Sequence, residues 1–156
     1  MVKVVRLTPE SFSKVVKETV KVLLSCGVVV TPTDTCYGLM ADIRNVRAVE
    51  KIYEIKKRPR NKPLPILVSS VEMAGKYGEL DEVALELIRK FMPGPLTVVV
   101  KKKEAVPDIV NPINAALRIP NNKFVLAVVE GLGGAVTGTS ANRSGDKPPY
   151  TVEDVK

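Results

Sequence analysis

Short runs of β-branched residues alternate along this chain with longer segments whose apolar residues recur at helical spacing. This alternation is typical of an α/β domain, in which helices pack on a sheet. Aromatic residues make up only 4% of the sequence and Trp is absent, so Val, Ile and Leu must fill most of the core. A chain of 156 residues is long enough to bury such a core, and we expect residues 1–156 to form one domain.

The apolar pattern predicts where the regular elements lie. Helices are expected to begin near Pro9 and at residues that cap helices well, because polar side chains there accept from free backbone N–H groups. These caps are Asn45, Ser69 or Ser70, Asp81, Asn121 or Asn122, and Thr151. Strands are predicted over residues 2–7, 28–30, 39–43, 64–68, 96–100, 115–119 and 135–139. The tight turn at Tyr37-Gly38 favours a mixed sheet over a purely parallel one.

Polar segments rich in Pro, Gly or basic residues follow several of these elements. They span residues 32–39, 56–64, 117–120 and 139–145. Ligands of α/β proteins bind beyond the ends of the strands, so these segments are the candidate site. In the second one, Lys56, Arg58 and Lys62 surround the end of a predicted helix. Such cations either neutralise phosphate oxygens or stabilise the helix C-terminus electrostatically.

The other polar segments offer hydroxyls, an amide and a guanidinium. Thr33 and Thr35 alternate with Asp34, a pattern that suits either a ligand or a turn held by side-chain hydrogen bonds. Arg118 lies in an apolar strand and therefore requires an anionic partner, which is either an acidic side chain or a ligand. The loop that contains Ser140, Asn142 and Ser144 can present hydroxyls and N–H groups to phosphate, although such loops are common.

The composition excludes several kinds of chemistry. Histidine is absent, which removes the usual general base and the Ser-His and Cys-His nucleophile pairs. Cys26 and Cys36 have no Cys/His cluster around them, so no metal site is predicted. The net charge of +7 suits anionic partners such as nucleotides or RNA. Because neither a signal peptide nor a membrane span is visible, we expect a cytoplasmic protein with reduced thiols.

The order of the motifs adds to this interpretation. Pro-Thr-Asp-Thr-x-Tyr-Gly-Leu, Lys-x-Arg with Lys-Pro-Leu, Pro-Gly-Pro-Leu-Thr, Leu-Arg-Ile-Pro and Thr-Ser-Ala-Asn-x-Ser-Gly follow one another between about Val4 and Pro149. In this order they resemble the YrdC family of threonylcarbamoyl-AMP synthases. The resemblance implies a twisted, open, mixed α/β sheet with a basic concave face. It also implies that ATP, with Mg²⁺, L-threonine and bicarbonate (or CO₂) give threonylcarbamoyl-AMP and pyrophosphate, and that a separate transferase uses the product for the t6A modification of tRNA.

The resemblance also assigns roles to residues. ATP binding falls to Lys56, Arg58, Lys62, Ser140 and Asn142, with Lys56 and Arg58 as the catalytic residues, and threonine binding falls to Thr33, Thr35, Tyr37 and Arg118. Asp34 is a candidate for the general base. Members of the family usually continue through a helix and further strands, so an open sheet edge is expected here. Either a second subunit covers that edge in a homodimer, or the chain has lost catalysis.

Two other functions fit the same residues. The first is a non-catalytic module that binds double-stranded RNA on the basic concave face. The second is carbamoyl transfer to an acceptor other than threonine, as in hydrogenase maturation modules. RNA affinity that depends steeply on salt and not on nucleotide would favour the first of these alternatives.

Overall fold

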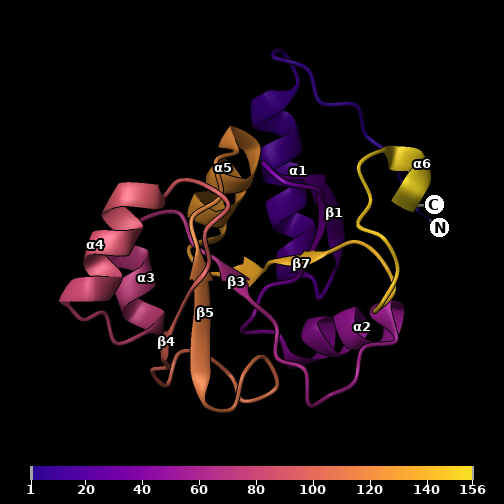
Figure 1. Cartoon of the computed structure of the whole chain (residues 1–156). Helices are drawn as coiled ribbons and strands as arrows, with labels where there is room; N and C mark the ends of the chain where they lie inside the picture. The colour runs from indigo at the N-terminus through magenta and orange to yellow at the C-terminus, as the bar shows by residue number, and fades with distance from the viewer. Residues whose placement is uncertain (1, 156) are drawn as a thin grey trace.

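The computed structural model describes residues 2–155 and has mixed α/β architecture, as the sequence predicts (Figure 1). Within these residues, none of the helices combines the length and hydropathy that crossing a bilayer requires. The elements in chain order are α1 (Phe12–Leu24), β1 (Val29–Pro32), β2 (Tyr37–Met40), α2 (Val46–Lys56), β3 (Ile66–Leu67), α3 (Val71–Tyr77), α4 (Glu82–Phe91), β4 (Val98–Lys101), β5 (Asn114–Arg118), α5 (Lys123–Leu132), β6 (Val136–Thr137), β7 (Thr139–Ser140) and α6 (Val152–Val155).

Most of the predicted helix caps are confirmed. The side chains of Asn45, Ser70, Asp81 and Asn122 each accept a hydrogen bond from the backbone N–H three residues further on, at the starts of α2, α3, α4 and α5. Each of these bonds satisfies one N–H group that has no partner inside its helix. At the start of α6, Asp154 N donates to Thr151 Oγ1 at 3.2 Å, and the Asp154 carboxylate accepts from the backbone of Thr151 at 2.8 Å.

The strands form two hydrogen-bonded sheets, where the sequence predicted one. The first has the order β1-β2-β7 and is antiparallel, and the second has the order β4-β5-β3-β6. In the second sheet β3 runs parallel to β5 and antiparallel to β6, so the mixed character is confirmed. The predicted strand over 135–139 is divided because β6 belongs to one sheet and β7 to the other.

Gly138 is the residue at which the chain passes between the sheets. Its N–H donates to Pro65 O at 2.8 Å, and a Cβ at this position would approach Leu67 Cδ2 to 2.7 Å. A larger residue would therefore require either the Leu67 side chain or the β6–β7 connection to shift. The junction is also held by Thr137, whose hydroxyl accepts from Ala41 N and donates to Leu39 O, both at 3.0 Å.

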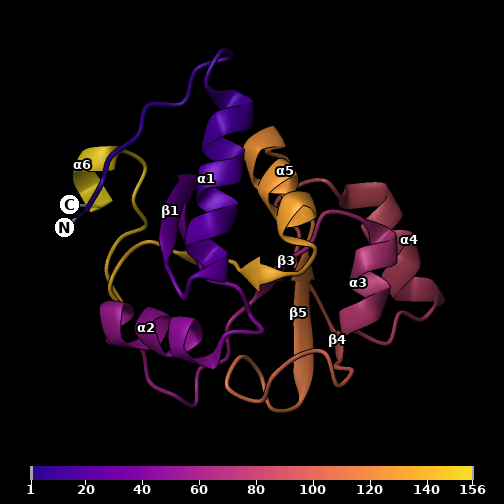
Figure 2. The same ribbon diagram turned by 180° about the vertical axis from the view of Figure 1, so that it is seen from behind.

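The predicted strand over Val2–Leu7 is wrong. Residues 2–7 have no regular structure, and the side chains of Val2 and Val4 are 89% and 65% exposed. The sequence alternates as a strand does, but a strand also requires a partner edge, and in this structure the segment has none. Figures 1 and 2 both show this segment running from the start of α1 toward α6.

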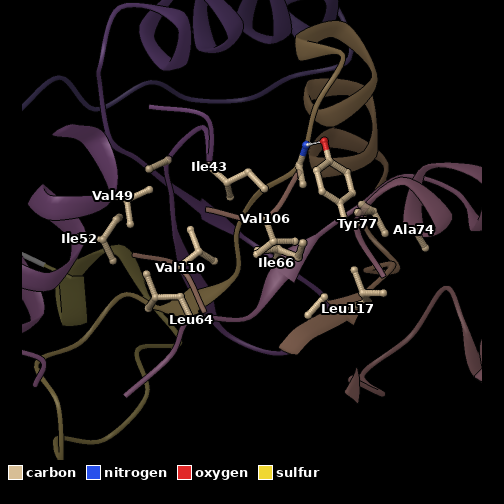
Figure 3. Close-up of a cluster of buried hydrophobic side chains, with 14 of the residues drawn as sticks. Ile43, Val49, Ile52, Leu64, Ile66, Ala74, Tyr77, Val106, Val110 and Leu117 are labelled. Carbon is tan, nitrogen blue, oxygen red and sulfur yellow. Dashed lines mark hydrogen bonds between the residues drawn. The ribbon is translucent and has the colours of Figure 1, made fainter. Parts of the chain in front are cut away.

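Two groups of buried side chains form the core. Helices α1 and α5 lie side by side in both views and cover one group, in which the rings of Phe12 and Phe124 meet edge to face at 5.9 Å (Figure 2). The other group lies around β3 and β5 and includes Ile66, Val106 and Leu117 (Figure 3). Aliphatic residues supply most of this volume, as the low aromatic content predicts.

Tyr77 supplies a polar contact inside this core. Its hydroxyl accepts a hydrogen bond from Ala135 N at 2.9 Å, and both residues are buried (Figure 3). We expect Tyr77→Phe to lower the free energy of unfolding by about 1–3 kcal/mol, because a buried N–H group would lose its acceptor. Urea denaturation measures this loss. Tyr150→Phe is the matched control, since Tyr150 is 68% exposed, and equal losses in both variants would contradict the prediction.

Candidate functional site

Lys56 is a buried lysine at the end of α2. Only 2% of the residue is exposed, and its ammonium group lies against the loop that follows β7. Nζ donates to Ser140 O, to Asn142 O at 2.7 Å and, more weakly, to Asn142 Oδ1 at 3.4 Å. All three acceptors are oxygens of uncharged groups. The positive charge is therefore not neutralised by these contacts, and the site can attract an anion.

The pKa of Lys56 is lowered from 10.5 to about 8, mainly by burial and to a smaller extent by the nearby charge of Arg58. The folded protein thus binds this proton less tightly than the unfolded chain does. Between about pH 8 and 10.5 the unfolded chain keeps the proton that the folded protein loses. The contribution of Lys56 to the free energy of unfolding therefore rises with pH over this range.

This sign gives a testable pH dependence. The free energy of unfolding of the native protein, minus that of Lys56→Met, should increase as the pH rises from 7.5 toward 9.5. Urea titrations of both proteins at several pH values measure the difference, and the other lysines cancel because both proteins contain them. A difference that stays constant, or falls, over this range would contradict the burial of a charged Lys56.

The loop of residues 140–146, which we call the Ser-Asn loop, is fixed on both sides. Ser140 pairs with Gly38 of β2, and Ala141 N donates to Tyr37 O at 2.8 Å. On the other side, Ser144 N donates to Lys56 O, also at 2.8 Å. The Asn142 side-chain amide donates within the loop, to Asp146 O at 2.7 Å. The loop is therefore held by β2, by α2 and by its own side chains.

One hydroxyl in this loop has no partner. Among the buried side-chain N and O atoms of residues 2–155, Ser144 Oγ alone makes no hydrogen bond. An unsatisfied buried hydroxyl costs free energy, which a bound oxygen-rich group would remove. Ser144 N bonds to the backbone carbonyl of Lys56, so the residue that carries this unpartnered hydroxyl adjoins the end of α2.

Arg118 forms a second cluster at the end of β5. Its Nε donates to Gly94 O at 3.0 Å, and both terminal nitrogens lie 3.3 Å from Thr35 Oγ1. Nη2 also donates to the carboxylate of Asp34. The side chains of Arg118 and Asp34 are only 12% and 13% exposed. The anionic partner that Arg118 requires is thus, in this structure, an acidic side chain.

The turn that carries Asp34 and Thr35 is closed by Thr33. Thr33 Oγ1 donates to Cys36 O at 2.8 Å, and Thr33 N donates to the same carbonyl at 3.2 Å. Thr35 N in turn donates to Thr33 Oγ1 at 3.1 Å. This is the turn held by side-chain bonds that the sequence pattern allowed. It leads directly into β2, so it holds Thr35 in place just before Tyr37.

The two clusters meet at the same end of β2. The turn of residues 33–36 precedes this strand, and the Ser-Asn loop bonds to Tyr37 and Gly38 at its start. The structure therefore brings Lys56 together with Ser140 and Asn142, and Arg118 together with Thr35. These residues lie up to 86 positions apart in the sequence.

The remaining predicted site residues are placed differently. Arg58 donates to Lys62 O at 3.0 Å and to Pro63 O at 2.8 Å, so its guanidinium fixes its own turn. Lys62 is exposed, and its carbonyl serves this turn. Tyr37 joins the site by its backbone, since Tyr37 N donates to Pro149 O at 2.9 Å. For these residues, as for those in the two clusters, the roles in ligand binding stay predictions.

Sequence reasoning missed two features. The sequence suggests Asp34 as a base but does not indicate that it pairs with Arg118, because the two residues are 84 positions apart. The sequence places Ser144 only among the loop hydroxyls that could face a phosphate, and it does not distinguish this hydroxyl from its neighbours. A buried hydroxyl without a partner becomes visible only once the fold is known.

Comparisons with known proteins agree with this geometry. The model of the Sua5/YciO/YrdC family, which carries the description "Telomere recombination", matches residues 21–156. The chain belongs to the Sua5/YciO/YrdC family. It is 39% identical over 99% of its length to a Methanocaldococcus jannaschii protein provisionally named a threonylcarbamoyl-AMP synthase. It is 36% identical over 82% of its length to the threonylcarbamoyl-AMP synthase of Bacillus subtilis. The resemblance to YrdC proteins is thereby confirmed.

A solved structure confirms the fold. The crystal structure of P. abyssi Sua5 complexed with L-threonine matches with a TM-score of 0.86 and 33% identity over 90% of this chain. The chain spans 73% of the M. jannaschii relative, 38% of the B. subtilis relative and 42% of the P. abyssi chain. The chain thus spans most of the first relative's length and less than half of the length of the other two.

Proposed function

We propose that this chain forms threonylcarbamoyl-AMP and pyrophosphate from ATP, L-threonine and bicarbonate. The observation that carries the proposal is the meeting of the two clusters at the start of β2, in a member of this family. One cluster offers a guanidinium and hydroxyls, and the other offers an ammonium and an unpartnered hydroxyl. These are suitable groups for an amino acid and for a polyphosphate, respectively.

The Arg118 cluster is the proposed threonine site. A guanidinium binds a carboxylate through two parallel hydrogen bonds, and Thr35 Oγ1 already lies 3.3 Å from this one. Thr33 holds the turn, and Tyr37 follows it at the start of β2. The likeness to a Sua5 structure that contains L-threonine supports this assignment.

The Lys56 cluster is the proposed site for the phosphates of ATP. Lys56 would exchange its weakest contact, the 3.4 Å bond to Asn142 Oδ1, for a phosphate oxygen. It would keep its bonds to the Ser140 and Asn142 carbonyls, which hold the Ser-Asn loop against α2. The unpartnered hydroxyl of Ser144 would then donate to the same ligand. Arg58 and Lys62 complete the basic side of this proposed site.

The described residues do not provide a metal cage. Within residues 2–155 there is no group of three or more His, Cys, Asp or Glu side chains that could hold a metal ion. Mg²⁺ is commonly held by substrate phosphates and water molecules, with few protein ligands. We therefore propose that Mg²⁺ arrives with ATP as part of the substrate.

The proposed reaction needs positioned charges more than a strong base. Bicarbonate takes up a proton and loses water to give CO₂. The neutral amine of threonine then attacks CO₂ to give a carbamate and releases one proton. A carbamate oxygen then attacks the α-phosphorus, and pyrophosphate leaves. Lys56 and Arg58 would stabilise the negative charge that grows on the phosphates, so the absence of histidine does not prevent the chemistry. The product would pass to a separate transferase for tRNA modification.

The burial of Lys56 favours this enzyme over the RNA-binding module. An RNA backbone would have to reach the cations on an exposed face, whereas only 2% of Lys56 is exposed. A small anionic group that replaces Asn142 Oδ1 has no such requirement. Membership in a family whose relatives carry the synthase name supports the same choice.

Pyrophosphate release tests the proposal. The protein is incubated with ATP, MgCl₂, L-threonine and bicarbonate, and pyrophosphate is measured while mass spectrometry follows threonylcarbamoyl-AMP. We expect release that requires both threonine and bicarbonate. Pyrophosphate that appears equally without threonine would point to another acceptor, and no release at all would reject the enzyme.

A further inference from the structure

The Asp34 carboxylate is bound to the Arg118 guanidinium, which is the group that a substrate carboxylate would bind. Nη2 of Arg118 already donates to the Asp34 carboxylate, and Thr35 Oγ1 lies near both terminal nitrogens. Nε is engaged by Gly94 O. All three nitrogens of this guanidinium thus have partners inside the protein. An incoming carboxylate can make two parallel bonds only if one of these partners leaves.

Asp34 is the partner that can leave most easily. The Gly94 carbonyl belongs to a turn bounded by Pro93 and Pro95, so it cannot rotate away alone. The Thr35 hydroxyl is held by Thr33, since the two Oγ1 atoms lie 3.1 Å apart and Thr35 N also donates to Thr33 Oγ1. By contrast, the hydrogen bonds that close the turn are made by Thr33, Thr35 and Cys36, and the Asp34 carboxylate takes part in none of them. The Asp34 side chain can therefore rotate while the turn stays closed.

We propose that Asp34 is an internal competitor for Arg118, which a ligand carboxylate must displace. This inference rests on the proposed function for its ligand, L-threonine, and it extends to other small monocarboxylates. The apparent affinity of a ligand is proportional to the fraction of molecules in which its site is free, so it decreases as that fraction decreases. If Asp34 holds Arg118 in about nine molecules of ten, removal of the competitor should tighten carboxylate binding about tenfold.

The inference predicts the unusual result that an acid-to-amide substitution improves binding only for ligands with a carboxylate. Calorimetry with native protein and Asp34→Asn should use L-threonine, 3-hydroxybutanoate, which lacks the amine, and threoninol, which lacks the carboxylate. We expect about tenfold tighter binding of the first two and unchanged binding of threoninol. Glu79→Gln is the matched control, because Glu79 is an acid in an exposed pair with Lys101.

A second measurement follows the reactivity of Arg118 without any ligand, so its result does not depend on the identity of the substrate. Phenylglyoxal modifies free guanidinium groups, and mass spectrometry can follow Arg118 alone. Arg118 should react several-fold faster in Asp34→Asn and in Asp34→Ala than in the native protein or in Glu79→Gln. Unchanged reactivity, or unchanged carboxylate binding in a folded Asp34→Asn, would overturn the inference.

The outcomes separate this inference from the proposed function. Weaker binding of both threonine and threoninol by Asp34→Asn would overturn it, because Asp34 would then be a ligand of the amine. If native protein binds 3-hydroxybutanoate as well as threonine and releases no pyrophosphate, the synthase proposal fails. Tighter 3-hydroxybutanoate binding and faster Arg118 modification in Asp34→Asn would still support the internal competitor in that case.

Discussion

Replacing Lys56 by Met should lower threonine-dependent pyrophosphate release by about 10²–10³-fold, the usual loss when one group that stabilises transition-state charge is removed. The substitution removes a buried cation, which is only 2% exposed, and it also releases the carbonyls of Ser140 and Asn142. Both changes act on the proposed phosphate site. Initial rates at saturating ATP, threonine and bicarbonate measure the loss.

Lys57→Met is the matched control for this experiment. Lys57 is the next residue, carries the same charge and is exposed, so its loss should change the rate less than about twofold. Circular dichroism and a urea titration establish that both variants fold. A folded Lys56→Met protein with native activity would show that the buried ammonium has no part in the reaction.

Replacing Arg118 by Met should raise the threonine concentration for half-maximal activity by about 10–100-fold, the equivalent of one or two hydrogen bonds to a charged group. The affinity for ATP should stay the same, because Arg118 contacts Thr35, Asp34 and Gly94 and not the Ser-Asn loop. Arg118→Lys should give an intermediate loss, since an ammonium keeps the charge but not the planar pair of donors.

The control for Arg118 is Arg89→Met, which removes an exposed guanidinium on α4. Steady-state rates over a range of threonine concentrations, with ATP binding measured by calorimetry, separate the two substrates. If Arg118→Met weakened ATP and threonine equally, the assignment of separate sites to the two clusters would be wrong.

Much of the fold could be predicted because its signals are local. A side chain that caps a helix acts within three residues, so Asn45, Ser70, Asp81 and Asn122 could be identified from the sequence. The strand pairing could not, because it depends on which edges meet in space. The unpaired segment at residues 2–7 and the division of the sheet at Gly138 both follow from that non-local choice.

The site shows the same limit. The residue types and the order of the motifs suggest Lys56, Arg118, Thr35, Ser140 and Asn142 as candidates, and the structure brings these residues into two clusters. The hydrogen-bond and ion-pair partners of these side chains could not be predicted from the sequence. The Asp34 carboxylate pairs with the Arg118 guanidinium, and Ser144 Oγ has no partner. Both facts depend on distances between segments that are remote in the sequence. A basic concave face stays a prediction.

A crystal structure with a non-hydrolysable ATP analogue and L-threonine is the most direct test of a single site at the start of β2. We predict phosphate oxygens at Lys56, Ser140 and Ser144, and the threonine carboxylate at Arg118 with Asp34 turned away. Ligands bound elsewhere on the molecule, with Lys56 and Arg118 still holding only their present partners, would contradict it.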